Sequence, residues 1–252
     1  MQKYLFLVFF LFSGNANSAS LSDTVATLKY AIVAVGTLQA DRTPPVSFLG
    51  TGFVVADGTY VVTNAHVLPP VLDVLENEKL VVFSGKGNKA EALDAKTVSI
   101  DAAHDLVILK IAGPPRPALR FGDSSLVREG DSLAFTGFPI GVVLGYYPVT
   151  HRATLSSITP IVIPAPHAEQ LSSRSIRQLR TPFAVFQLDA TAYPGNSGSP
   201  LYLPDSGKVV GIVNMVFVKS TKEKILSDPS GIAYAIPGEY IVDLIRKAGL
   251  SP

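Results

Sequence analysis

Residues 51–63 of this chain read Thr51-Gly-Phe-Val-Val-Ala-Asp-Gly-Thr-Tyr-Val-Val-Thr63. Apolar and β-branched residues flank the dipeptide Asp57-Gly58, and this pattern predicts two strands, 51–56 and 59–63. A two-residue turn with positive φ suits Asp-Gly, so we expect the two strands to pair as a hairpin. The same texture of short strands and turns runs through most of the chain, which indicates an all-β fold.

Ten further segments share period-two alternation or a β-branched run bounded by Gly, Pro or Asp. They are 31–38, 80–83, 92–100, 106–111, 132–137, 149–157, 184–188, 199–203, 209–218 and 231–236. Between the two halves, Gly113-Pro114-Pro115-Arg116-Pro117 is too rich in proline for a helix or a central strand. We therefore predict two packed, six-stranded antiparallel barrels, 20–112 and 121–237, joined by a linker at 113–120.

Only the end of the chain carries a clear helical pattern, which predicts an α-helix within residues 238–252. Arg246 and Lys247 fall in its last turn, and Gly249 is placed to cap it. The apolar stripe that defines this helix is formed by Tyr240, Ile241, Leu244, Ile245 and Ala248.

Residues 1–19 have the pattern of a secretory signal peptide. Lys3 precedes an apolar run at 4–12, and small and polar residues follow up to Ala19. We expect cleavage after Ala19, with Ala16 as the alternative. The run is far shorter than the ~20 residues that span a bilayer, so no permanent membrane anchor is expected. The predicted location is outside the cytoplasm, periplasmic or secreted.

Composition excludes several classes of function. The 252 residues are 47% hydrophobic and 16% charged, which is typical of a globular protein. The formal net charge is +1 with dispersed Lys and Arg, so no nucleic-acid partner is expected. The chain has no Cys, which excludes disulfides and thiol catalysis. Its four His lack acidic neighbours at ligand spacing, so we predict no metal site and no cofactor.

The sharpest local motif is Pro194-Gly195-Asn196-Ser197-Gly198-Ser199-Pro200. Glycines on both sides of a serine allow a tight turn and keep bulk away from the hydroxyl. The backbone of 195–197, chiefly the amides of Gly195 and Ser197 with Asn196 between them, is the candidate oxyanion hole. Taken alone, the motif is equally consistent with an ordinary surface turn.

A serine nucleophile needs a base, and His66 is the best candidate. It ends the strand-like run 61–66, whereas His151 lies mid-strand and His167 in a proline-rich loop. His104 is a rival base, but its neighbour Asp105 would point in another direction from an extended chain. Asp105 opens the apolar run 105–111 and is placed to orient an imidazole.

The chain order is His66, Asp105, Ser197, with the first two in the first half. This is the order of the chymotrypsin plan. An α/β-hydrolase needs a histidine after its serine, and none follows Ser197. A subtilisin-like enzyme needs Asp before His on a parallel sheet, which the predicted antiparallel strands exclude.

The sequence resembles the trypsin-like serine peptidases, and within them the bacterial HtrA (Deg) branch. The resemblance implies a chymotrypsin-like fold and a serine endopeptidase with His66, Asp105 and Ser197 as its triad. It also implies protein or peptide substrates and allows a homo-oligomer, a trimer in HtrA proteins. The similar blocks are 50–55, 62–67, 104–111, 122–141, 187–198 and 231–237. They follow one another in order, so the resemblance extends along essentially the whole mature chain.

Two departures from the HtrA pattern matter, together with one difference from the digestive trypsin-like enzymes. Ser199 stands where HtrA proteins usually carry a glycine, and in this the motif is similar to that of glutamyl endopeptidases. Those enzymes use a pocket histidine on a strand after the nucleophile, and this chain has no histidine near Asn214. The chain ends after its terminal helix, so we expect no PDZ domain. Asn196 replaces the aspartate that binds the new N-terminal amine in digestive relatives. An amide cannot form that ion pair, so the loops of this protein must order the site themselves.

The expected specificity pocket carries no charge, which predicts cleavage after small or medium apolar residues. Asp189 would become a pocket acid only in a shifted register. The predicted lining residues are Thr191, Asn214, Met215, Val216, Ala233, Tyr234 and Ala235.

Two other functions stay open at this point. The same fold without catalysis would give a silent or chaperone-like binding protein. Residues 159–182, rich in Pro and Arg, are either a partner-binding or gating loop or a solvated surface loop.

Overall fold

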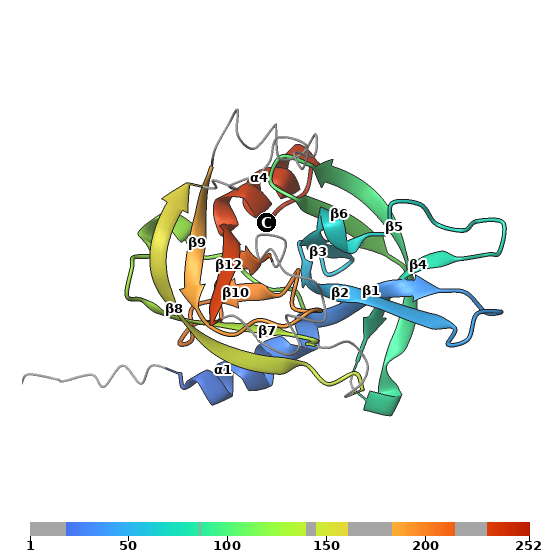
Figure 1. Ribbon diagram of the computed structural model, residues 1–252, viewed down its shortest axis with the longest axis horizontal. Helices are drawn as coiled ribbons and strands as arrows, with labels where there is room; N and C mark the ends of the chain where they lie inside the picture. The colour runs from blue at the N-terminus through green and yellow to red at the C-terminus, as the bar shows by residue number, and fades with distance from the viewer. Residues whose placement is uncertain (1–18, 86, 140–144, 161–182, 215–230) are drawn as a thin grey trace, which may run out of the picture.

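The computed structural model describes residues 19–85, 87–139, 145–160, 183–214 and 231–252. Two closed, six-stranded barrels lie side by side in it (Figure 1). All strand pairs within the barrels are antiparallel. The predicted fold class is therefore confirmed. The predicted signal peptide, 1–19, lies outside the described residues except for Ala19.

The first barrel closes in the order β1-β2-β3-β6-β5-β4. β1 and β2 pair around a bulge at Val35/Gly36, where a Cβ on Gly36 would lie 2.4 Å from the Ser47 carbonyl oxygen. Its strands are β1 Ile32–Leu38, β2 Val46–Val55, β3 Tyr60–Asn64, β4 Lys79–Ser84, β5 Glu91–Asp101 and β6 Leu106–Ile111.

The second barrel closes in the order β10-β11-β12-β9-β8-β7. Residues 113–120, between the barrels, form neither helix nor strand. The predicted strand 209–218 is described only as far as β11, because 215–218 lie outside the described residues. The strands are β7 Ser132–Gly137, β8 Val149–Pro160, β9 Ala184–Asp189, β10 Pro200–Tyr202, β11 Val209–Val213 and β12 Ile232–Pro237.

The hairpin at Asp57-Gly58 forms, but its predicted two-residue turn is wrong. Val55 pairs with Tyr60, so four residues connect β2 to β3. The Asp57 carboxylate accepts a hydrogen bond from the Thr59 amide at 2.9 Å. This local bond stabilises the longer turn, in which Ala56 and Gly58 rather than Asp57 have positive φ.

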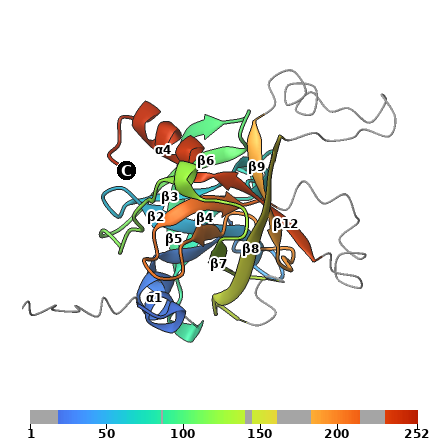
Figure 2. The ribbon, with the colours of Figure 1, turned by 90° about the vertical axis from the view of Figure 1, so that its left-hand side faces the viewer.

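Two α-helices complete the described structure. α4, Gly238–Lys247, confirms the predicted terminal helix and buries Ile241, Leu244 and Ile245. Gly249, at φ +75, ends it with an amide that donates to the Arg246 carbonyl. α4 packs against β6 and β11, one strand from each barrel (Figure 2). Single 3-10 turns are η1 Lys29–Ala31, η2 Ala65–Val67, η3 Gly87–Lys89 and η4 Ser124–Leu126.

The helix α1, Leu21–Leu28, was not predicted. Ser20 and Asp23 form a capping box, in which the Ser20 hydroxyl accepts from the Asp23 amide and the Asp23 carboxylate accepts from the Ser20 amide. The spacing Ser-x-x-Asp was therefore a local signal for a helix start. It was missed because this segment was interpreted only as the beginning of the mature chain.

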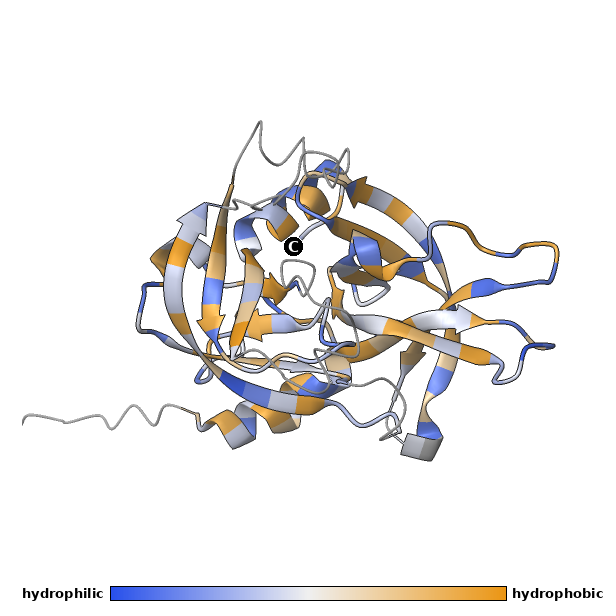
Figure 3. Ribbon diagram, viewed as in Figure 1, coloured by the Kyte–Doolittle hydropathy of each residue, from blue (hydrophilic) through white to orange (hydrophobic). Residues whose placement is uncertain are grey.

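Buried apolar residues form the cores of both barrels. Hydrophobic and hydrophilic residues alternate along many strands (Figure 3). One core cluster includes Phe53, Leu106 and Ile108 in the first barrel and extends to α4. A second, centred on Leu133, Phe135 and Leu188, fills the second barrel. Among the described helices, none is long and apolar enough to cross a membrane.

Candidate active site

His66 and Asp105 meet at the end of β3. His66 lies in the turn η2 directly after this strand, and Asp105 comes directly before β6, the strand that pairs with it. The His66 Nδ1 and Asp105 Oδ2 atoms are 2.5 Å apart, and the His66 amide donates to Oδ1 at 2.9 Å. Because an ionised carboxylate only accepts, it favours a proton on Nδ1 and leaves Nε2 able to accept one. The Asp105 side chain is 1% exposed and that of His66 23%.

Asp105 receives further hydrogen bonds from three other residues. Its backbone lies in the left-handed region, at φ +58, and its carbonyl accepts from the Ala65 amide at 2.9 Å and from Asn64 Nδ2 at 3.1 Å. Asn214 Nδ2 donates to its Oδ2 at 2.7 Å. A carboxylate buried this deeply is stabilised by several donors.

Asn214 corrects a prediction. It was expected to line the specificity pocket, but it is fully buried and its side chain points to Asp105. Its amide donates to the Tyr234 carbonyl at 2.8 Å, which continues the pairing of β11 with β12. Asn214 and Asn64 are both part of the site, and sequence reasoning gave neither of them this role. A single local pattern does not show that Asn64 and Asn214, 41 and 109 positions away from Asp105, bond to its backbone carbonyl and its carboxylate, respectively.

The segment around Ser197 packs against the first barrel. The Thr51 amide of β2 donates to the Ser197 carbonyl at 2.9 Å. Gly198 has φ +89, and a Cβ there would lie 1.9 Å from the Thr51 carbonyl oxygen, so only glycine fits. A Cβ on Gly50 would lie within 3.0 Å of both the Val67 side chain and the Ser197 carbonyl. Ser197 therefore lies beside the turn that carries His66.

The candidate oxyanion turn spans Tyr193 to Asn196. The Asn196 amide donates to the Tyr193 carbonyl at 3.0 Å, and Gly195 has φ +99. This geometry, with Pro194 second and glycine third, is that of a type II turn. The Asn196 amide is used within the turn, which corrects its inclusion among the expected oxyanion donors. The backbone amides of Gly195 and Ser197 stay the candidates.

Ser199, where the HtrA pattern has a glycine, is accommodated by Gly137 at the end of β7, the strand that pairs with β10. Its hydroxyl oxygen lies 1.9 Å from the point where a Cβ on Gly137 would be. The Ser199 hydroxyl and both polar atoms of the Asn196 side chain are buried without hydrogen-bond partners among the described residues.

The other described histidines occupy different sites. The His104 Nδ1 atom lies 2.7 Å from Asp101 Oδ2, and its ring stacks on Tyr240 of α4 at 4.1 Å between centroids. The His151 ring stacks on Phe135, and burial lowers its pKa. Each of these two rings thus has partners of its own. His167 lies outside the described residues.

The remaining pocket predictions fare differently. Ala233 and Ala235 are fully buried in the core of the second barrel, which corrects their expected position in the pocket wall. Side chains alternate along a strand, so Tyr234, which is half-buried, faces the other side of β12. Thr191 is half-buried in the loop after β9. Met215 and Val216 lie outside the described residues, as does 161–182.

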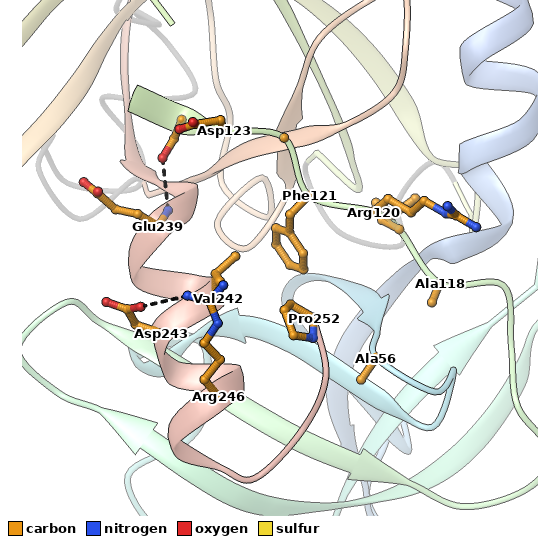
Figure 4. A pocket seen from close by; sticks show the side chains of 13 residues that line it. Ala56, Ala118, Arg120, Phe121, Asp123, Glu239, Val242, Asp243, Arg246 and Pro252 are labelled. Carbon is orange, nitrogen blue, oxygen red and sulfur yellow. Dashed lines mark hydrogen bonds and ion pairs between the residues drawn. The ribbon is translucent and has the colours of Figure 1, made fainter. Parts of the chain in front are cut away.

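A separate pocket of about 790 Å³ lies between the connection 118–124 and α4 (Figure 4). Phe121 lines it, together with Arg120, Arg246 and Asp243, and no candidate catalytic residue does. Within the described residues, no group of three or more His, Asp or Glu is arranged to hold a metal ion.

Comparison with known proteins gives this arrangement a family. The protein-family model described as "Trypsin-like peptidase domain" matches residues 50–212, which include His66, Asp105 and Ser197. The chain belongs to the trypsin-like peptidase family. The matched range runs from β2 to β11 and therefore includes parts of both barrels.

The curated relatives of this trypsin-like peptidase domain compared below share the same protein name. The "probable periplasmic serine endoprotease DegP-like" of Brucella suis biovar 1 is 34% identical over 206 residues, covering 79% of this chain and 33% of the relative. The protein of the same description from Halomonas elongata is 30% identical over 196 residues, covering 78% and 34%. The chain spans about a third of the length of these relatives.

Solved structures show the same fold. The HtrA-type protease AlgW with decapeptide has a TM-score of 0.66 and 23% identity, covering 91% of this chain and 67% of that one. The Rv3671c protease from M. tuberculosis, in its active form, has a TM-score of 0.65 and 22% identity, covering 91% and 85%.

Proposed function

We propose that this protein is a serine endopeptidase with Ser197 as nucleophile, His66 as base and Asp105 as the carboxylate that orients it. The observation that carries the proposal is the His66–Asp105 hydrogen bond, formed beside a Ser197 that β2 holds against the first barrel. A buried carboxylate on the Nδ1 side of an imidazole prepares Nε2 to take a proton from a serine hydroxyl.

The proposed reaction has two stages. Ser197 Oγ attacks the carbonyl carbon of the scissile peptide while its proton passes to His66 Nε2. The amides of Gly195 and Ser197 donate to the oxyanion that forms. The C–N bond then breaks, and His66 returns the proton to the leaving amine. Water, deprotonated by His66, hydrolyses the resulting acyl-enzyme and restores Ser197.

The proposed substrates are proteins or peptides encountered outside the cytoplasm. The curated relatives are named as periplasmic endoproteases, and AlgW is described with a bound decapeptide. The apolar run 4–12 followed by small residues supports export of this chain as well.

A labelling experiment tests the proposed activity. A fluorophosphonate probe reacts with an activated serine, so it should label the purified protein, and Ser197→Ala should abolish labelling. The same preparation should cleave an unfolded protein such as casein. A folded protein that neither reacts nor cleaves would instead support the silent, chaperone-like binding protein.

We propose cleavage after small or medium apolar residues. Asp189 is exposed at the end of β9, where it pairs with Ile232, and this position favours a scaffold role over that of a pocket acid. A substrate charge buried without a partner would destabilise the complex by several kcal/mol. Cleavage-site profiling with a peptide library should therefore show Val, Ala or Leu before the cut bond. Dominant cleavage after Arg or Lys would contradict this and would point to Asp189.

A further inference from the structure

Asn64 is a buried amide that is only half satisfied. It is the last residue of β3 and is fully buried. Its Nδ2 donates to the Asp105 carbonyl at 3.1 Å, whereas its Oδ1 has no hydrogen-bond partner among the described residues. An unsatisfied buried acceptor destabilises a fold, so an apolar side chain of similar size would suit this position at least as well for stability.

The bond from Asn64 acts on an unfavourable backbone conformation. Asp105 is one of three non-glycine residues with positive φ among those described. In this conformation its carboxylate reaches back to the turn that carries His66, with Oδ1 on the His66 amide and Oδ2 on the ring. The Asp105 carbonyl is held at the same time by Asn64 Nδ2 and by the amide of the next residue, Ala65. Two donors from consecutive residues thus fix the peptide plane that follows Asp105.

We propose that Asn64 is a positioning residue, which sets the direction of the Asp105 carboxylate and thereby the orientation of His66. It touches neither substrate nor the reacting atoms, and it acts through the Asp105 backbone. In this it differs from Asn214, which donates to the carboxylate directly. The inference rests on the proposed peptidase function. It also gives a role to an amide that is only half satisfied in a buried position.

The test is a double-mutant cycle with Asn64→Leu and Asp105→Asn. Leu has a similar volume and removes the unsatisfied acceptor, so the melting temperature should be unchanged or higher. We expect Asn64→Leu to lower kcat/KM by about 10- to 100-fold in the wild-type background. In the Asp105→Asn background the same change should lower it less than about threefold, because the carboxylate that Asn64 positions is already gone. Equal losses in both backgrounds would overturn the proposal.

A spectroscopic readout is independent of turnover. The proton in the short His66 Nδ1–Asp105 bond should give a resolved downfield ¹H signal, which Asn64→Leu should shift or broaden. An unchanged signal in a folded Asn64→Leu protein would contradict a positioning role. If this variant does not fold, Asn64→Ala is measured by the same criteria.

Thr37→Val is the matched control. Thr37 is buried on β1, and its hydroxyl donates to Glu78 away from the candidate site. This variant should lose stability. Its kcat/KM should stay within about twofold of the wild-type value, and its downfield signal should not shift. If the wild-type protein has no peptidase activity at all, the proposed function fails, and the NMR comparison still decides the role of Asn64.

Discussion

The hydrogen-bond partners of the Asp105 carboxylate come from both barrels. His66 belongs to the turn after β3 in the first barrel, and Asn214 follows β11 in the second. A buried charge supported from two sides is sensitive to the loss of any one donor. At the scale of single residues, the site therefore depends on a few hydrogen bonds whose removal should affect activity more than folding.

Ser197→Ala and His66→Ala should each lower kcat/KM by about 10⁴-fold or more, and the double variant should lose little beyond that, because triad members act as a unit. Asp105→Asn should cost a similar order by favouring the wrong imidazole tautomer. Steady-state kinetics on a peptide ester, with circular dichroism to check folding, would measure this.

His104→Ala is the control for the base. Its ring is held by Asp101 and Tyr240, so this variant should keep catalysis. Loss of activity in His104→Ala together with a working His66→Ala would exchange the two assignments.

At the scale of elements, two long connections of the first barrel are tied together by Glu78. Its Oε1 accepts from Thr37 Oγ1 at 2.6 Å and from Arg42 at 2.7 Å, and its Oε2 accepts from the Asp73 amide at 3.0 Å. These bonds, that from Thr37 foremost, lower the pKa of Glu78 from its ordinary value of 4.5 to about 2. The carboxylate joins β1 to the connection that precedes β4.

Glu78→Gln should destabilise the protein by about 1–2 kcal/mol at neutral pH, with allowance for solvent screening. Because the folded-state pKa is depressed, this contribution is fully present above about pH 4.5 and is lost as the pH falls towards about 2. Urea unfolding of both proteins at about pH 7 and about pH 2.5 measures it. A stability difference that does not shrink on acidification would contradict the assignment.

The start of α4 is capped by a residue far away in sequence. Its own N-cap residue, Pro237, makes no side-chain cap, and the Glu239 amide donates instead to Ser124 Oγ at 3.1 Å. Figure 4 shows this bond at the edge of the pocket beside α4. The bond links η4 to the helix and so fixes α4 across the two barrels.

Ser124→Ala should lower the free energy of unfolding by about 1 kcal/mol, the usual contribution of a helix cap. Ser125→Ala is the matched control, because the Ser125 hydroxyl donates to the exposed Asp123 carboxylate and its loss should change stability by less than about 0.5 kcal/mol. Denaturant unfolding of the two variants measures the contrast. Equal effects would show that the Ser124 cap contributes nothing specific.

At the scale of the whole molecule, the candidate site lies where the two barrels meet, so neither barrel holds it alone. Thr51 of β2 shows this best, since its amide donates to the Ser197 carbonyl and its hydroxyl to the Gly195 carbonyl. The homo-oligomer that the HtrA resemblance allows stays a prediction, as do the two alternatives for 159–182, a partner-binding or gating loop and a solvated surface loop.

We expect the exported protein to begin near Ser20 and to be found in the periplasm of a host that has one. Cleavage there would leave the capping box of α1 intact, with Asp23 beside the new N-terminal amine. N-terminal sequencing of the native protein measures the cleavage site. Recovery of intact residues 1–12 in a membrane fraction would contradict export by this route.

Local sequence patterns are sufficient to predict most of the strands, the terminal helix and the candidate residues His66, Asp105 and Ser197. Strand and helix patterns follow from local periodicity, because each side chain must face either the core or water. The candidate catalytic residues can be predicted because a triad needs only three residue types, a nucleophile, a base and a carboxylate. Their order along the chain differs between fold families. The start of α1 also had a local signal, the spacing of Ser20 and Asp23.

Which buried side-chain amides bond to Asp105 is visible in the tertiary structure alone. Asn64 and Asn214 have no distinctive local pattern, and their roles depend on the direction of one side chain toward a residue in another element. The same holds for the Asn196 amide, which the turn from Tyr193 uses, and for Ala233 and Ala235, which face the barrel core. A shift of one residue in a strand reverses such directions, so they are fixed by packing and pairing rather than by composition.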